Sequence, residues 1–228
     1  MHATYLARDE AGSIDGGVAV VVDVMRAFTV AAWALHLGAE RLTLVDDIEQ
    51  AVDLAAEDGS LLFKDGVPDP RFDLHNSPRQ LLDLDVAGRS IVQRTTAGTR
   101  SAVAARGADT LFCTGLVSAS ATAAAIAELG AGACTFVVSG GLQAEEDLAC
   151  AELIAGLVTD PSLENGPFVE RAGRSKAAER LKADVAAGYT GVTAEDVPMC
   201  LDVDRFDTPL LADLGGPHPV LRAPGTPR

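Results

Sequence analysis

A strand-like run followed by a polar turn, a helix-like stretch and a glycine occurs three times along the chain. The three runs begin near residues 18, 90 and 111, and each consists mainly of consecutive apolar side chains. Glycine just beyond a helix commonly takes the left-handed conformation that ends the helix. The three glycines are Gly38, Gly107 and Gly130. Because strands that are apolar on both faces and alternate with helices are typical of βαβ units, the pattern predicts a three-layer α/β/α fold around a mainly parallel sheet.

The chain has 228 residues, which is enough to bury a sizeable core. We expect residues 1–212 to form one compact α/β domain, with the alternative of two fused subdomains that divide near residues 85–90. Residues 213–228 are rich in proline and glycine, and this composition predicts a poorly ordered tail.

The chain is acidic, with a formal net charge of −15 at pH 7. Binding to nucleic acid or to an anionic membrane depends on clustered Lys and Arg, so we expect neither as a partner. No apolar run is long enough to span a bilayer, and the acidic residues within 1–15 argue against an export signal, so we expect a cytoplasmic protein. The charge is compatible with a cationic cofactor. An acidic, apolar-rich α/β protein could also form a homodimer, although no segment indicates an interface.

Polar side chains gather where the expected strands end. In parallel α/β sheets, ligands bind in the loops that follow the carboxyl ends of the strands. The candidate loops are residues 23–29, 94–100, 114–120 and 139–147, together with an irregular segment at 71–78.

The loop at 94–100 combines threonine hydroxyls, a glycine and two flanking arginines. Hydroxyl groups, a close backbone and the free N–H groups of a helix N-terminus together form a cradle for an anion. Either Arg94 or Arg100 could add a two-pronged contact to such an anion. The alternative is that Thr95 or Thr96 only caps the helix and that the arginines are solvated.

Asp23 directly follows the apolar run 18–22, so its carboxylate must lie at the exposed end of a strand or be paired. Such a carboxylate could bind Mg²⁺, act as a nucleophile or hold Arg26 in place. The alternative is a structural Asp–Arg pair within a turn.

The loop at 139–147 places Glu145, Glu146 and Asp147 beside a Ser-Gly-Gly turn. Acidic residues at the start of a helix are favourable for electrostatic reasons alone. They could also hold a hard cation, because Mg²⁺ in proteins takes one or two carboxylates together with water and substrate phosphate.

Taken together, these segments resemble the 2-phosphosulfolactate phosphatase (ComB-like) family. The matching segments span about residues 18–210, and they are "VDVMRAFTVAAWALHLGAE", "FDLHNSPR", "RTTAGTRS", "TGLVSASATAAAI", "SGGLQAEEDLACAELI" and "DVPMCLDVDRF". The resemblance implies an α/β fold, dependence on Mg²⁺ and hydrolysis of a phosphate monoester on a small acidic three-carbon substrate. The chain departs from the family at four places: His75 stands for Gly, Ala97 for Asn, Ser118 lies where an Asn is usual, and Lys64-Asp65 stands near a Gly-Glu pair. We expect these departures to remove two amides and one carboxylate.

We therefore expect a Mg²⁺-dependent hydrolase that acts on 2-phosphosulfolactate or a related phosphorylated 2-hydroxy acid. The expected catalytic residues are Asp23, Arg26, Glu146 and Asp147, and the expected metal ligands are Asp23, Glu146 and Asp147. The expected substrate-binding residues are Thr29, Asn76, Ser77, Thr95, Thr96, Gly98, Thr99, Arg100, Gly140 and Gly141. Either Asp23 or a metal-bound water molecule could be the nucleophile. The alternative function is non-catalytic binding of a phosphorylated or sulfonated metabolite.

Overall fold

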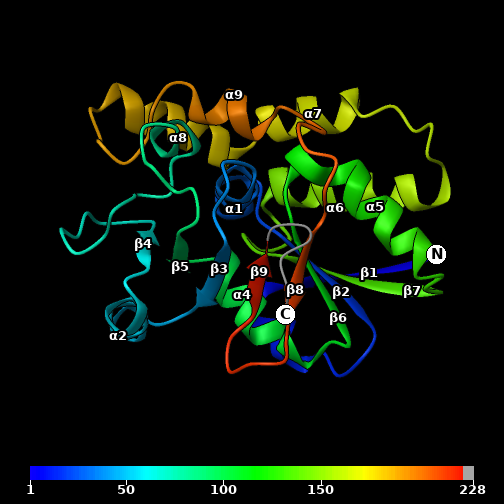
Figure 1. The fold of residues 1–228 in the computed structure, drawn as a ribbon. Coiled ribbons are helices and arrows are strands. Elements are labelled where there is room, and N and C mark those ends of the chain that lie inside the picture. Colours follow the sequence, from blue (N-terminus) through cyan, green and yellow to red (C-terminus); the bar gives the residue numbers. More distant parts are fainter. Residues whose placement is uncertain (223–228) are drawn as a thin grey trace.

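The computed structural model describes residues 1–222, and its centre is a nine-stranded sheet (Figure 1). One block of parallel strands has the order β1 (His2–Ala7), β7 (Ala133–Val138), β2 (Val18–Val22) and β6 (Thr110–Thr114). A second parallel block has the order β3 (Arg41–Val45), β5 (Ser90–Arg94) and β4 (Leu61–Lys64). The antiparallel strands β8 (Leu210–Asp213) and β9 (Val220–Arg222) join the two blocks. The prediction of an α/β fold with a mainly parallel sheet is confirmed.

The chain crosses between the two blocks twice. Helix α1 (Ala27–His36) leads from β2 in the first block to β3 in the second, and α4 (Gly98–Ala104) leads from β5 back to β6. Strands from before and after residues 85–90 are therefore neighbours in both blocks. The loops that follow β2 and β5 meet, since a Cβ placed on Gly98 would lie 2.6 Å from Asp23 Oδ2. The two crossings thus bring one strand end from each block to the same place.

Helices pack on both blocks of the sheet. Helices α5 (Ala119–Glu128) and α6 (Glu145–Thr159) share an apolar core with the first block, and α2 (Ile48–Asp58) shares a smaller one with the second. Helices α1 and α4 contribute to the core between the blocks. Helices α7 (Gly166–Gly173), α8 (Lys176–Ala186) and α9 (Asp196–Cys200) run along the top of Figure 1. Among residues 1–222, no helix has both the length and the apolar character that crossing a bilayer requires.

The short elements complete the chain: α3 (Pro78–Leu81) and the 3-10 turns Arg8–Ser13, Ala105–Gly107 and Leu116–Ser118. Two of the three glycines that were expected to end helices are left-handed, with φ of 93° at Gly38 and 62° at Gly130. The prediction is wrong for Gly107, which has no such φ. That position instead needs glycine because a Cβ would collide with the carbonyl oxygen of Ile14.

The prediction of a poorly ordered tail is wrong for part of residues 213–228. Strand β9 lies within that segment and pairs with β3 on one side and with β8 on the other. The Leu221 side chain is completely buried between the two blocks. Without β8 and β9, strands β6 and β3 would present unpaired edges to each other, so β9 belongs to the core of the sheet. Residues 223–228 lie outside the described part of the chain.

We predict that Leu221→Ala lowers the free energy of unfolding by about 2 to 4 kcal/mol, because it leaves a cavity between the two blocks. Leu211→Ala on β8 is the matched control, since the Leu211 side chain is exposed, and it should change stability by less than about 0.5 kcal/mol. Urea unfolding followed by circular dichroism measures both variants. Equal losses for the two variants would contradict a structural role for β9.

Candidate active site

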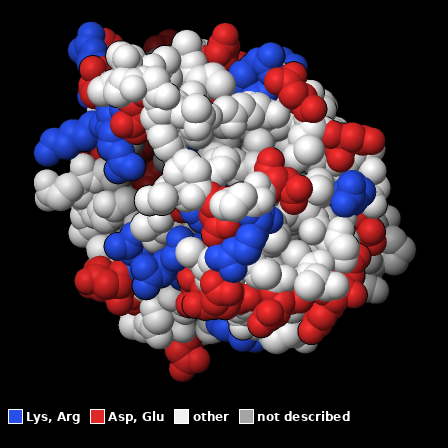
Figure 2. All heavy atoms as spheres, turned by 90° about the vertical axis from the view of Figure 1, so that its left-hand side faces the viewer, with Lys and Arg blue, Asp and Glu red and all other residues white. Residues whose placement is uncertain are grey.

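A cavity of about 510 Å³ lies where the loops after β2, β4 and β5 meet. The strand-end side of the cavity is lined by Asp23, Met25, Arg26, Asp65, Gly66, Val67, Pro68, Asn76, Thr96 and Ala97. Helix α8 and Tyr189 line the opposite side. This volume lies within the range of small-molecule binding sites. Acidic and basic side chains are interspersed on the face of the molecule that carries β4 and α2 (Figure 2).

Arg26 is held in the cavity wall by a buried ion pair. Its Nη1 donates to the carboxylate of Asp196 and to the carbonyl oxygen of Gly191, the latter at 3.0 Å. The Asp196 side chain is completely buried. A guanidinium has five N–H donors, and among residues 1–222 the other donors of Arg26 have no protein acceptor. Arg26 therefore has N–H groups left with which it can bind an anion in the cavity.

Asp196 was not among the expected site residues. Besides Arg26, its carboxylate accepts hydrogen bonds from the Ser77 hydroxyl at 2.7 Å and from the Thr193 hydroxyl at 3.1 Å. The backbone N–H of Arg79 is a further donor, at 3.2 Å. Asp196 thus ties the loop after β2 to the starts of α3 and α9. The segment "DVPMCLDVDRF" contains Asp196, and its match to the family is the signal that could have identified this residue.

The Asp23 carboxyl lies at the end of β2 and is buried at the bottom of the cavity. Its Oδ1 accepts a hydrogen bond from the backbone N–H of Ala27 at 3.0 Å, and its Oδ2 lies against Gly98. Burial, together with the nearby carboxylates of Asp65 and Glu146, raises the pKa of Asp23 to about 7, although two backbone N–H groups act in the opposite direction. Gly98 is required here, because a Cβ would overlap both Asp23 and Ala27.

Asp147 joins two loops at the edge of the first block. Its Oδ1 accepts from the backbone N–H of Val24 at 2.8 Å, and its Oδ2 accepts from that of Gly140 at 3.0 Å. Burial, together with the charges of Asp23 and Glu146, raises the pKa of Asp147 well above its ordinary value. Burial likewise raises the pKa of Glu146. Asp23, Glu146 and Asp147 are thus close enough to affect one another electrostatically.

The three expected metal ligands do not all face the cavity. Asp23 lines it, whereas Glu146 and Asp147 do not, and neither do Gly140 and Gly141. Within residues 1–222, no three His, Cys, Asp or Glu side chains converge closely enough to hold a metal ion by themselves. Asp65 is the other carboxylate at the strand ends that lines the cavity.

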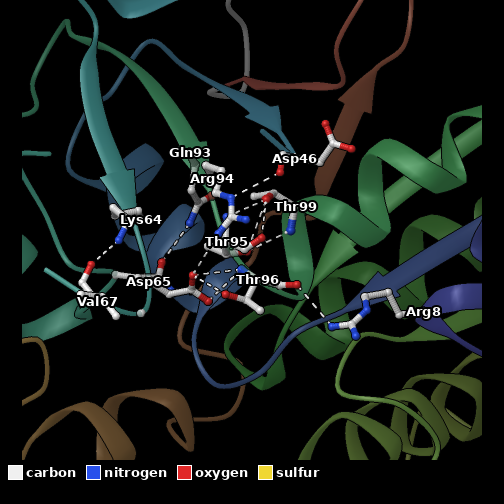
Figure 3. A network of polar contacts seen from close by, with 12 residues as sticks. Arg8, Asp46, Lys64, Asp65, Val67, Gln93, Arg94, Thr95, Thr96 and Thr99 are labelled. Carbon is white, nitrogen blue, oxygen red and sulfur yellow. Dashed lines mark hydrogen bonds and ion pairs between the residues drawn. The ribbon is translucent and has the colours of Figure 1, made fainter. Parts of the chain in front are cut away.

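Thr95 and Thr99 cap the start of α4, which was the alternative to an anion cradle. Thr95 Oγ1 accepts from the backbone N–H of Thr99 at 3.0 Å, and Thr99 Oγ1 accepts from that of Thr95 at 2.7 Å. Figure 3 shows the two side chains next to each other, and both are buried. These hydroxyls therefore fix the shape of the loop, and they are not free to bind a ligand.

Thr96 donates hydrogen bonds to the carboxylate of Asp65, an anionic group of the protein itself (Figure 3). Its backbone N–H and its hydroxyl each donate to the Asp65 carboxylate at 2.8 Å. Arg94 Nη1 lies 3.9 Å from Asp65 Oδ1. The loop after β5 thus has the donors of an anion site. The expectation that a carboxylate is lost near Lys64-Asp65 is wrong, since Asp65 supplies one inside the cavity.

The remaining expected residues differ in their relation to the cavity. Asn76 lines the cavity in a left-handed conformation with φ of 57°, and its Oδ1 accepts from Gln93 Nε2 at 3.1 Å. Ser77 caps α3, and the Thr29 hydroxyl donates to the carbonyl oxygen of Val24 at 2.9 Å, so both residues position the loops. Arg100 is exposed and does not line the cavity.

Besides Asp65, which lines the cavity, three other departures from the family differ in their relation to it. Ala97 lines the cavity. His75 Nδ1 is buried without a hydrogen-bond partner in the described part of the chain, and burial lowers the pKa of this imidazole. The Ser118 hydroxyl is buried 3.3 Å from Thr114 Oγ1 and does not line the cavity.

We predict a pH-dependent stability in EDTA that depends on Asp23. Between about pH 4 and pH 7 the folded protein keeps a proton on Asp23 that the unfolded chain has lost, so stability should fall as pH rises through this range. Asp23→Asn removes this pH-dependent contribution to the free energy of unfolding. The variant should therefore gain stability relative to the wild type by about 1 to 4 kcal/mol as the pH rises from 4 to 7. Urea unfolding at several pH values measures the difference. The exposed Asp53→Asn is the control, and an equal pH slope for all three proteins would contradict a raised pKa at Asp23.

Comparisons with known proteins show the family to which the chain belongs. A sequence model of the family described as 2-phosphosulpholactate phosphatase matches residues 5–210. A probable 2-phosphosulfolactate phosphatase of Thermus thermophilus is 36% identical over 201 residues, which cover 82% of this chain and 84% of that relative. A probable 2-phosphosulfolactate phosphatase of Bacillus subtilis is 33% identical over 167 residues, which cover 71% of this chain and 73% of the relative. The chain therefore belongs to the 2-phosphosulpholactate phosphatase family.

Proposed function

We propose that this protein hydrolyses a small anionic phosphate monoester, 2-phosphosulfolactate or a related phosphorylated 2-hydroxy acid, in a Mg²⁺-dependent reaction. The observation that carries the proposal is the contact between Thr96 and Asp65. A backbone N–H and a hydroxyl that already hold a carboxylate can hold phosphoryl oxygens in the same way. Arg26 lines the same cavity with unused N–H donors, which a phosphoryl group would accept.

The carboxylates fit a magnesium ion in number and in kind. Mg²⁺ is a hard cation that takes one or two carboxylates and fills its other positions with water and substrate phosphate. Asp23 and Asp65 line the cavity, and we assign them as the residues that would hold the ion. Glu146 and Asp147 would act behind Asp23, where Asp147 holds the loops after β2 and β7 together. Bound there, Mg²⁺ would neutralise charge on the phosphoryl oxygens.

The chain's own groups account for the remaining steps. Arg26, held by Asp196, would bind the phosphoryl group and orient it, and catalysis of phosphoryl transfer comes mainly from such positioning and charge neutralisation. A water molecule would be the nucleophile, and Asp23, ionised when it holds Mg²⁺, would accept a hydrogen bond from that water and orient it. As the phosphorus–oxygen ester bond breaks, the leaving hydroxyl would take up a proton.

A non-catalytic binding protein is the second candidate, and one observation favours it. Asp65 makes three hydrogen bonds to Thr96 and so occupies the donors that a phosphoryl group would need. A metabolite could compete with Asp65 for these donors without being hydrolysed.

We predict phosphate release from 2-phosphosulfolactate and 2-phospholactate with Mg²⁺, and none with EDTA. Arg26→Gln should lower kcat/KM by about 10²- to 10³-fold, because it removes a charged donor aimed at the phosphoryl group. Asp196→Asn should act in the same direction, since it frees Arg26 to leave its position. Circular dichroism would show whether each variant is folded. No release from any ester by folded wild-type protein, despite tight binding of the ester, would favour the binding protein.

A further inference from the structure

Helix α8 presents one face to the cavity. Ala177, Arg180, Leu181 and Asp184 line it, and their spacing of three and four residues places them on one side of the helix. Ser175 caps the start of the helix, since its hydroxyl accepts from the backbone N–H of Ala178 at 3.1 Å. At its other end, the Tyr189 hydroxyl donates to the carbonyl oxygen of Gly66. The segment after the helix is therefore attached to the loop after β4, while this face of the helix lies across the cavity from the strand ends.

Arg180 is a cationic side chain on that face, and it is weakly engaged. Its side chain is 80% exposed, and Nε lies 3.8 Å from Asp184 Oδ2. An exposed pair at this distance contributes little to stability and leaves the guanidinium available. Arg26 differs, because the buried Asp196 holds it on the opposite side of the cavity. Two arginines thus line opposite sides of the cavity: Arg26, which Asp196 holds in place, and Arg180, which is only weakly paired.

The second arginine suits a ligand with two acidic ends. The substrate class of the proposed function carries a carboxylate in addition to its phosphoryl group, and 2-phosphosulfolactate also carries a sulfonate. A guanidinium binds either oxyanion with two parallel hydrogen bonds, which an ammonium group cannot do. With the phosphoryl group between Arg26 and Thr96, the other end of such a molecule would extend toward α8.

We propose that Arg180 binds the carboxylate or sulfonate of the substrate. Through this contact, α8 would favour phosphorylated hydroxy acids over phosphate esters that have no second acidic group. This inference rests on the proposed function, because it assigns the phosphoryl group to the strand ends. Arg180 binds through its guanidinium, and Asp184 keeps that group near the cavity until the oxyanion replaces it.

The test compares Arg180→Gln with the wild type on three esters: 2-phosphosulfolactate, 2-phospholactate and p-nitrophenyl phosphate. The variant should raise KM for the esters with an acidic group by about 10- to 100-fold, the value of a charge-assisted hydrogen bond, and change kcat by less than about 3-fold. Hydrolysis of p-nitrophenyl phosphate, which has no second acidic group, should stay within about 2-fold. A rise for 2-phosphosulfolactate alone would assign the sulfonate, and a rise for both acidic esters would assign the carboxylate.

Two further variants sharpen the comparison. Arg180→Lys keeps the charge without the planar fork, so it should restore only part of the affinity. Arg174→Gln is the matched control, because the Arg174 side chain is 79% exposed, pairs with Glu170 and does not line the cavity. This control should leave all three substrates unchanged.

The outcomes separate this inference from the proposed function. If Arg180→Gln raised KM equally for esters with and without a second acidic group, or raised it for neither, the role of Arg180 would be overturned. The proposed phosphatase activity would still stand. If the wild type hydrolyses no ester, titration calorimetry with 2-phosphosulfolactate still tests whether Arg180 binds the ligand. In that case Arg180→Gln should weaken binding by about 10- to 100-fold, and an unchanged Kd would overturn the assignment.

Discussion

The site depends on the buried ion pair between Arg26 and Asp196. Taking both charges out of water is costly, and such a pair persists only where further hydrogen bonds satisfy it. Here Ser77, Thr193 and the backbone of Arg79 all donate to the same carboxylate. Loss of one partner would leave an uncompensated buried charge, which typically costs about 3 to 5 kcal/mol. The pair therefore fixes the direction of Arg26 and couples three distant segments of the chain.

The sheet explains why these segments meet. Helices α1 and α4 each cross from one parallel block to the other, so the loops after β2 and β5 arrive at one place from opposite directions. Asp23 comes from the first block, whereas Thr96 comes from the second. Gly98 lets the two loops touch, because any side chain there would overlap Asp23. Strands β8 and β9 hold the blocks together and so keep the two halves of the site in register.

Much of the fold could be predicted from the sequence, since continuous apolar strands that alternate with helices have few other solutions. Strand β9 could not, because a three-residue strand flanked by proline and glycine gains its stability from partners far away in the chain. Asp23 could be identified because it directly follows a buried strand. Thr95 could not be assigned, because capping a helix and binding an anion require the same kind of residue at the same position.

Two other residues of the site could not be predicted from the sequence for a similar reason. Asp196 opens a short helix, where an acidic residue is favourable for local reasons, so nothing nearby signals its partner 170 residues away. Arg180 lies on a helix whose pattern is that of an ordinary exposed one, and only its position across the cavity gives it significance. Local pattern thus identifies residues at strand ends, whereas residues that other elements bring to those ends require the structure.

The most direct test of the account is a crystal structure of the protein with Mg²⁺ and orthovanadate, which mimics a phosphoryl group in transfer. The account predicts vanadate in contact with the Arg26 guanidinium and the Thr96 N–H, with Asp65 displaced from Thr96. Vanadate bound elsewhere, with Asp65 still on Thr96 and Arg26 without an anion, would contradict it.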